Sequence, residues 1–223
     1  MKRNNTTLKE SAFKYENNYL VLAGADDAIS YLKYLTSEVE GSGYSNIMDA
    51  IFAAQMEENP YFQNILGLCY FVGFGCKEDH SEALCWWGKA AEQDDDCAMY
   101  FLGRSHLYGD GTEKDYIQAK SWLECAAKKG HNGAQVMLGN MYFDGLGIAT
   151  KYYDAVFWYK KAAKSGNPEA MFRLYACYTN GQGVRRNLKR ATDYLFKSAV
   201  QGYQDAINEI KHLKELIEGL DNK

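Results

Sequence analysis

Apolar and polar residues follow one another along most of this chain with the spacing of amphipathic helices, and pairs of glycines interrupt them at regular intervals. From Asn132 to Gly166, apolar positions first recur every three or four residues, which predicts a helix. A Gly-Leu-Gly turn then ends that helix, because glycine readily adopts positive φ. A second run with the same spacing covers residues 153–164, and Gly166 closes it. The pattern therefore predicts a unit of two helices joined by a turn.

This unit recurs with a period of 36 residues from residue 60 to residue 203. Loop glycines, an alanine and an aromatic residue all keep that spacing. They are Gly73, Gly109, Gly145 and Gly181; Ala83, Ala119, Ala155 and Ala191; and Trp86, Trp122, Trp158 and Tyr194. Both prolines, Pro60 and Pro168, follow an asparagine at a unit boundary, which predicts an Asn N-cap with Pro in the first helical position. Because one helix pair cannot bury its apolar face alone, the units are expected to stack as a solenoid.

The repeat divides the chain into segments of one solenoid domain. These are an N-terminal segment (1–24), a degenerate repeat (25–59), four repeats (60–95, 96–131, 132–167 and 168–203) and a C-terminal capping helix (204–223). In the last segment Ala206, Ile210, Leu213, Ile217 and Leu220 share one helical face. We expect that face to cover the open edge of the last repeat.

Small residues inside the first helices indicate close helix packing. Gly67, Gly103 and Gly139 fall in mid-helix, where glycine costs about 1 kcal/mol relative to alanine. Close approach of two helices would compensate for this cost, while the tryptophans at 86, 122 and 158 are expected to fill the gaps between units. The last repeat has Tyr175 at the glycine position, so its packing is expected to differ.

The repeat resembles the Sel1-like repeat (SLR) family, whose 36-residue units are related to tetratricopeptide repeats. Residues 139–147 (GNMYFDGLG) and 158–166 (WYKKAAKSG) carry the resemblance almost letter for letter. His106 departs from it at a tyrosine position, and the paired cysteines of some bacterial members are missing. The resemblance implies an all-α fold, a right-handed α/α superhelix whose first helices line a concave groove. It also implies adaptor work: binding a protein or peptide.

Alignment with the small position of the family assigns the residues that line this groove. The partner-binding candidates are Asn64, Phe71, Tyr100, Arg104, Leu107, Asn140, Phe143, Phe172 and Thr179, with Leu68, Val136 and Ala176 beside them. Aromatic and arginine side chains suit this role because they are common anchors of protein interfaces. Leu68, Leu107 and Val136 could instead belong partly to the core.

Charge and hydropathy narrow the range of partners. The net charge is −4, and the mean hydropathy of −0.46 comes with no apolar run of the roughly 20 residues that a membrane span requires. The N-terminus starts with Lys2 and Arg3 but lacks the apolar region of a signal peptide. We therefore expect a cytoplasmic protein that neither binds nucleic acid nor spans a membrane, with a removed leader as the alternative. The family resemblance implies a bacterial protein, which we expect to be monomeric. The basic cluster of residues 185–190 is interpreted as a solvated loop and helix start.

No constellation of residues suggests catalysis, a cofactor or a metal. The six cysteines lack metal-ligand spacing and a repeating pattern, so they are interpreted as buried free thiols. Ser11 and Ser30 begin Ser-x-x-Lys motifs, but the other motifs of penicillin-binding enzymes are missing. In the run of aspartates at 94–96, Asp96 is expected to cap the next helix.

Three functional hypotheses remain. The first is a non-enzymatic scaffold that binds a protein or peptide in the groove. The second is an immunity protein that neutralises a bacterial toxin or effector, since bacterial members of the family are used in this way. The third, and least supported, is a β-lactam-binding or β-lactam-hydrolysing enzyme.

Overall fold

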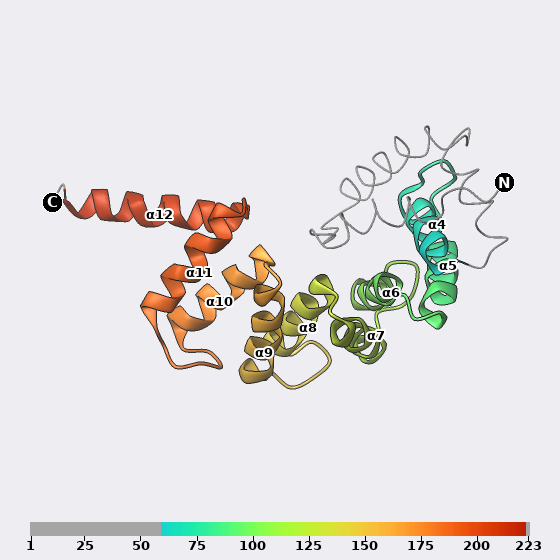
Figure 1. Cartoon of the computed structure of the whole chain (residues 1–223), viewed down its shortest axis with the longest axis horizontal. Helices are drawn as coiled ribbons and strands as arrows, with labels where there is room; N and C mark the ends of the chain where they lie inside the picture. Colours follow the sequence, from blue (N-terminus) through green and yellow to red (C-terminus); the bar gives the residue numbers. More distant parts are fainter. Residues whose placement is uncertain (1–58, 222–223) are drawn as a thin grey trace, which may run out of the picture. The chain divides into compact units, whose positions relative to one another are not determined.

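The structure, a computed structural model, describes residues 59–221. The expected N-terminal segment, almost all of the degenerate repeat and both Ser-x-x-Lys motifs lie outside the described residues. Within them the chain forms nine α-helices and no strand (Figure 1). They are α4 (Pro60–Val72), α5 (His80–Glu92), α6 (Asp96–Tyr108), α7 (Tyr116–Lys129), α8 (Asn132–Asp144), α9 (Tyr152–Lys164), α10 (Pro168–Asn180), α11 (Leu188–Val200) and α12 (Gln204–Asp221). None of these is long and apolar enough to span a membrane.

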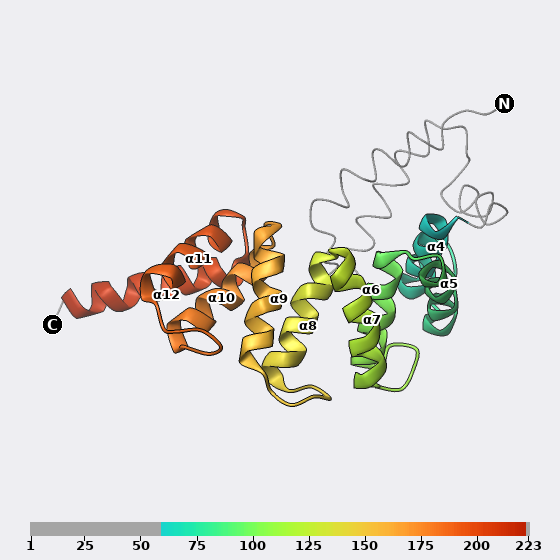
Figure 2. The ribbon, with the colours of Figure 1, turned by 60° about the horizontal axis from the view of Figure 1, so that its bottom comes forward.

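The chain forms two compact units, Met1–His131 and Asn132–Lys223. The described part of the first unit contains the pairs α4–α5 and α6–α7, and the second unit contains α8–α9, α10–α11 and the single helix α12. In each pair the two helices lie side by side (Figures 1 and 2). Consecutive pairs meet through α5 and α6 in the first unit and through α9 and α10 in the second.

Short polar side chains start most of these helices. Asn59 Oδ1 accepts a hydrogen bond from Tyr61 N at 3.0 Å, and Asn167 Oδ1 accepts one from Ala170 N at 2.9 Å. Both Asn-Pro N-caps predicted from the sequence are therefore confirmed. The expected cap at Asp96 is wrong by one residue, because Asp95 caps α6 and Asp96 occupies the first turn. Asp94 takes the left-handed conformation, with φ 73°, at the position where the other three repeats have glycine.

The loop within each repeat is held at both ends by backbone contacts. In each repeat, the residue immediately before the second helix donates its backbone N–H to a backbone carbonyl in the last turns of the first helix, with N to O distances of 2.8–2.9 Å. These pairs are Asp79–Tyr70, Asp115–His106, Lys151–Tyr142 and Asn187–Tyr178. The loop of the second repeat of the first compact unit also packs against the repeat before it, since a Cβ on Gly111 would lie 2.7 Å from the backbone of His80. Gly183 lies more tightly still against the start of α9, where its added Cβ would overlap the backbone carbonyl group of Tyr152.

The mid-helix glycines leave room for a side chain of the paired helix, as the sequence predicts. A Cβ on Gly103 would lie 2.7 Å from Leu123 Cγ, and one on Gly139 would lie 2.5 Å from the ring of Tyr159. Trp87 lies in the same way against Gly67. These residues come one position after the tryptophan positions singled out in the sequence. Trp86 and Trp122 are only partly buried, whereas Trp158 is buried. That the tryptophans fill the gaps between repeats stays a prediction.

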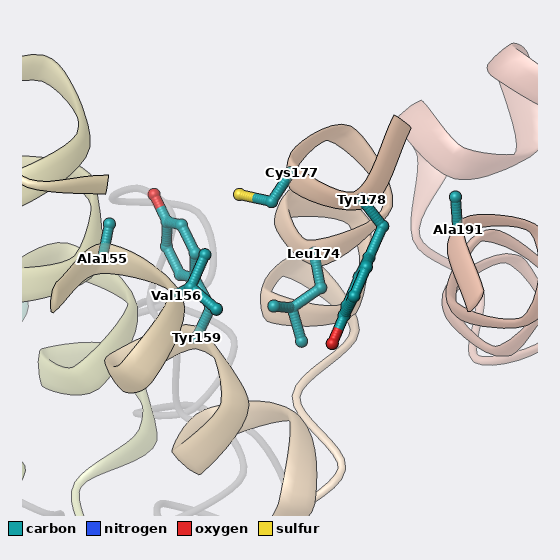
Figure 3. Close-up of a cluster of buried hydrophobic side chains, with 7 residues drawn as sticks. All are labelled: Ala155, Val156, Tyr159, Leu174, Cys177, Tyr178 and Ala191. Atoms are coloured by element: carbon teal, nitrogen blue, oxygen red, sulfur yellow. The ribbon is translucent and has the colours of Figure 1, made fainter. Parts of the chain in front are cut away.

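The core of the second unit runs through three successive helices. Figure 3 shows α10 in the middle, with α9 on one side of it and α11 on the other. Tyr159 of α9, Leu174 and Tyr178 of α10 and Ala191 of α11 contribute to one buried cluster. Apolar surface removed from water stabilises a fold by about 25 cal/mol per Å². Burial of this kind is the main contribution that holds neighbouring repeats together.

Helix α12 covers the last repeat with its first half only. Ala206 is fully buried, and Tyr175 donates a hydrogen bond of 2.5 Å to Glu209 Oε1. The apolar face expected to continue through Leu213 and Ile217 is exposed at both residues.

All six cysteines are free, but the expectation that they are buried holds only in part. Cys69 and Cys177 are buried, and burial raises their thiol pKa values to about 12 and about 11. Cys85 and Cys125 are exposed on α5 and α7, because each falls on the outer side of a second helix.

Candidate functional site

The candidate site of the first unit lies on the first helices α4 and α6. Arg104, in the middle of α6, has its guanidinium carbon 5.4 Å from the ring centre of Phe71 and 5.6 Å from that of Tyr108. Its Nη1 also lies 3.5 Å from Asp110 Oδ2. We call Phe71, Arg104, Tyr108 and Asp110 the arginine cluster. Two aromatic rings and a carboxylate thus fix the orientation of one partly exposed guanidinium.

The local sequence explains how the arginine cluster forms. Tyr108 lies four residues after Arg104, so both side chains share one face of α6. Gly109 takes φ 84° and ends the helix, which brings Asp110 back towards the arginine. Phe71 comes from the preceding repeat and stacks on His80, with ring centres 4.5 Å apart. The cluster therefore depends on the contact between two repeats.

Behind this cluster, a row of aromatic rings crosses the two repeats. Phe71 also contacts Trp87, with ring centres 5.6 Å apart, and Trp87 stacks on Phe101 at 4.9 Å. The Trp87 indole donates to the backbone carbonyl of Asn64 at 3.2 Å. Tyr100 continues the row next to Phe101. Such packing leaves the rings little freedom to reorient when a partner binds.

The row ends at His131, in the loop before α8. Its ring stacks on Tyr100 with centres 4.5 Å apart. Burial lowers the pKa of His131 to about 4, and the nearby carboxylate of Asp96 opposes that shift. His131 is therefore neutral at pH 7, and the stacked pair carries no charge.

The second unit repeats part of this arrangement with different chemistry. Phe143 of α8 contacts Tyr152 edge-on at 5.0 Å, whereas the pair at the same positions two repeats earlier, Phe71 and His80, is stacked. Asn140 Oδ1 accepts a hydrogen bond of 2.7 Å from the buried hydroxyl of Tyr159. On α10, Phe172 lies 5.5 Å from the ring of Tyr203. These contacts are made by aromatic and amide side chains, and the charges of Arg173, Asp144 and Glu169 act on Tyr159 nearby.

The remaining sequence-predicted lining residues differ in accessibility. Asn64, Tyr100, Leu107, Leu68 and Val136 are buried. Thr179 is partly buried and donates to the carbonyl of Tyr175 at 2.8 Å. The buried members shape the wall of the first helices, and Arg104, Phe71, Asn140, Phe143 and Phe172 keep some exposure.

Two members of the arginine cluster were missed by the sequence reasoning. Tyr108 is 52% exposed, and Asp110 lies in the loop beyond the helix. The i,i+4 spacing of Arg104 and Tyr108 was the available signal. Asp110 could not be found in this way, because its position depends on the turn at Gly109. Across residues 59–221, no three His, Cys, Asp or Glu side chains gather closely enough to hold a metal ion.

Comparison with known proteins shows which family the sequence matches. The model of the Sel1 repeat matches residues 60–95, 98–131, 133–167 and 168–203, which is more than half of the chain. The chain belongs to the Sel1 repeat family. The resemblance predicted from the sequence is thereby confirmed, and so is the all-α fold of a repeat solenoid. Sel1 repeat proteins are in general scaffolds for protein interactions, and their fold is typically non-catalytic.

Two solved structures illustrate the relationship. A Sel1 repeat protein from Oxalobacter formigenes is 29% identical, with a TM-score of 0.66 over 82% of this chain and 70% of that one. The protective antigen c5321 of uropathogenic Escherichia coli, which displays an SLR fold, is 26% identical with a TM-score of 0.70. That match covers 92% of this chain and 50% of c5321, so this chain spans half the length of the antigen. None of the curated proteins matches this chain.

Proposed function

We propose that this Sel1 repeat protein is a non-enzymatic scaffold that binds a protein or peptide through its first helices. The arginine cluster carries the proposal. Arginine and tyrosine are the residues most enriched among interface hot spots, and here both are exposed enough to reach a partner. The rings and Asp110 hold the guanidinium in place before binding, so less side-chain entropy is lost when a partner docks.

The chemistry of the cluster indicates what it would bind. Asp110 lies 3.5 Å from one guanidinium nitrogen, which leaves other donors of Arg104 available for a carboxylate or backbone carbonyl of the partner. On the second unit, Asn140, Phe143, Phe172 and Thr179 offer uncharged side chains, with Arg173 and Glu169 nearby. A partner segment that presents acidic and apolar side chains would suit the first of these surfaces.

Affinity capture from the native lysate, followed by mass spectrometry, tests the proposal. The double variant Arg104→Ala/Tyr108→Ala should lose the captured partner, since hot-spot truncations cost about 2 kcal/mol or more each. Arg185→Ala/Tyr153→Ala is the matched control, because it removes the same residue types from exposed positions of the second unit. Equal recovery of the partner by wild type and by the Arg104/Tyr108 variant, with unchanged helical circular dichroism, would refute the assignment.

A further inference from the structure

The positive charge of this acidic protein is concentrated in one stretch. Residues 151–200 contain ten Lys and Arg and only three Asp and Glu, a net charge of +7 within a chain of −4. Of the ten cations, only Arg173 forms an ion pair among the described residues. The others are Lys151, Lys160, Lys161, Lys164, Arg185, Arg186, Lys189, Arg190 and Lys197, and all nine are exposed. A solvated loop accounts for part of this set but not for its spread over two helices.

Exposed apolar side chains lie among these cations. On the outer side of α9, Tyr153 is 77% exposed and Phe157 is 48% exposed. On the outer side of α11, Phe196 is 54% exposed and Val200 is 86% exposed. Lys161 lies over Phe157, with 4.8 Å between Nζ and the ring centre. Large apolar groups placed in solvent beside cations indicate a surface that binds something.

Two contacts join the helices into one surface, which we call the basic-aromatic face. Lys160 of α9 and Arg190 of α11 both approach the ring of Tyr178, at 5.9 Å and 5.8 Å from its centre. Arg190 Nη1 also donates to the Tyr178 hydroxyl at 3.4 Å. At the other end, Gly183 packs against the start of α9, which holds the loop of Arg185 and Arg186 beside α9. Figure 2 shows the three helices α9, α10 and α11 that carry this face.

We propose that the basic-aromatic face docks the protein on an anionic membrane surface. Lysines near such a surface each contribute about 1 kcal/mol, and exposed aromatic and aliphatic side chains insert at the headgroup level. A bilayer accepts cations and apolar groups without a shape-matched pocket, which fits side chains that point outward from two helices. The proposal is independent of partner binding by the first helices.

The composition of the face favours lipid over the other anionic partners. Lysine is depleted in the cores of protein–protein interfaces, yet it supplies six of the nine exposed cations here. Nucleic-acid-binding domains are basic as a whole, and this chain has a pI of 5.6. Val200 and Leu188, which is 55% exposed, gain nothing from phosphates or bases, whereas the acyl boundary of a bilayer accepts them.

Co-sedimentation of the purified full chain with lipid vesicles tests this proposal. Vesicles of phosphatidylcholine with about 30% phosphatidylglycerol should bind the protein at about 0.1 M salt, and pure phosphatidylcholine should not. The variant Lys164→Glu/Lys189→Glu/Lys197→Glu should bind about 100-fold more weakly, since each lysine contributes roughly a factor of five. Phe157→Ser/Phe196→Ser should lose about tenfold on the same vesicles, because apolar insertion is reduced.

The control changes the same charge elsewhere. Lys77→Glu/Lys114→Glu/Lys128→Glu alters three exposed lysines of the first unit, and it should bind within about twofold of wild type. Helical circular dichroism checks that each variant is folded before its binding is compared. Equal loss in both triple variants would overturn the proposal, as would binding to poly-L-glutamate or single-stranded RNA without binding to the vesicles. Partner capture by the Lys164/Lys189/Lys197 variant should be unchanged, so the two proposals fail separately.

Discussion

Two identical substitutions in the first unit should have opposite effects on stability. Alanine in place of a mid-helix glycine normally stabilises a helix by about 1 kcal/mol. At Gly88 of α5 an added Cβ meets nothing within 4 Å, so Gly88→Ala should stabilise the protein by about this amount. At Gly103 of α6 the added Cβ would lie 2.7 Å from Leu123 Cγ and 3.1 Å from Leu123 N. Normal carbon contacts are about 3.5–4.0 Å, so the methyl group overlaps its neighbours.

The size of the effect at Gly103 follows from two opposing contributions. Overpacking of a filled core costs about 1–3 kcal/mol, and it can exceed the gain in helix propensity. Gly103→Ala should therefore be destabilised by about 1 kcal/mol, so the two variants should differ by about 2 kcal/mol. Leu123 cannot easily move away, because it is fully buried and its overlapping atoms include the branch carbon and the backbone nitrogen.

Urea denaturation of the full chain, followed by helical circular dichroism, measures both variants. The double variant Gly103→Ala/Leu123→Ala provides an internal check, because removing the leucine side chain relieves the overlap. Its loss of stability should be smaller than the sum of the two single losses. If Gly103→Ala is as stable as Gly88→Ala, then α6 and α7 do not approach as closely as described, and glycine at this position has another cause.

Three further outcomes are expected. The free energy of unfolding should fall as the pH drops from 6.5 towards 4, by up to about 1.4 kcal/mol per pH unit. The reason is that the pKa of His131 is about 4 in the folded state and 6.5 in the unfolded state, so the unfolded state binds the proton first. In urea titrations at several pH values, His131→Gln should reduce this dependence on pH. Tyr175→Phe should lower the melting temperature through a loss of about 1 kcal/mol, since it removes the hydrogen bond to Glu209, whereas Tyr153→Phe should not. Asp115→Ala should cost about 1 kcal/mol in urea, because Asp115 Oδ1 accepts from Ile117 N and Gln118 N, while Asp115→Asn should retain most of the cap.

The repeat architecture could be predicted from the sequence because its evidence is local. Gly73 and its equivalents end helices whatever surrounds them, and Asn167 with Pro168 starts one by satisfying a backbone amide. The need for small residues at Gly67, Gly103 and Gly139 was equally visible, since mid-helix glycine has a cost that packing must offset. Each of these rules acts within one or two turns of chain.

The side chains that fill the glycine positions could not be predicted. Trp86 and Trp87 are adjacent and both aromatic, yet only Trp87 faces Gly67. One residue corresponds to about 100° around a helix, so the choice depends on the rotation of α5 against α4. The place of Asp110 in the arginine cluster could not be predicted either, because Asp110 reaches Arg104 only through the turn at Gly109. From the sequence, the basic cluster of residues 185–190 was interpreted as a solvated loop and helix start. Its link to α9 could not be predicted, because the cations of α9 and α11 meet only at the ring of Tyr178.

Tyr175 has a consequence for how this protein can change in length. The three repeats before it carry a glycine at that position, and each begins and ends at matching points of the 36-residue period. A duplicated copy of residues 132–167 therefore begins and ends at the same points of the period as the repeat that it copies. A unit added after Tyr203 would compete with α12 for the surface that Tyr175 and Glu209 join. Evolutionary growth of this array is expected to occur by internal duplication, with the last repeat and α12 carried along as one inherited block.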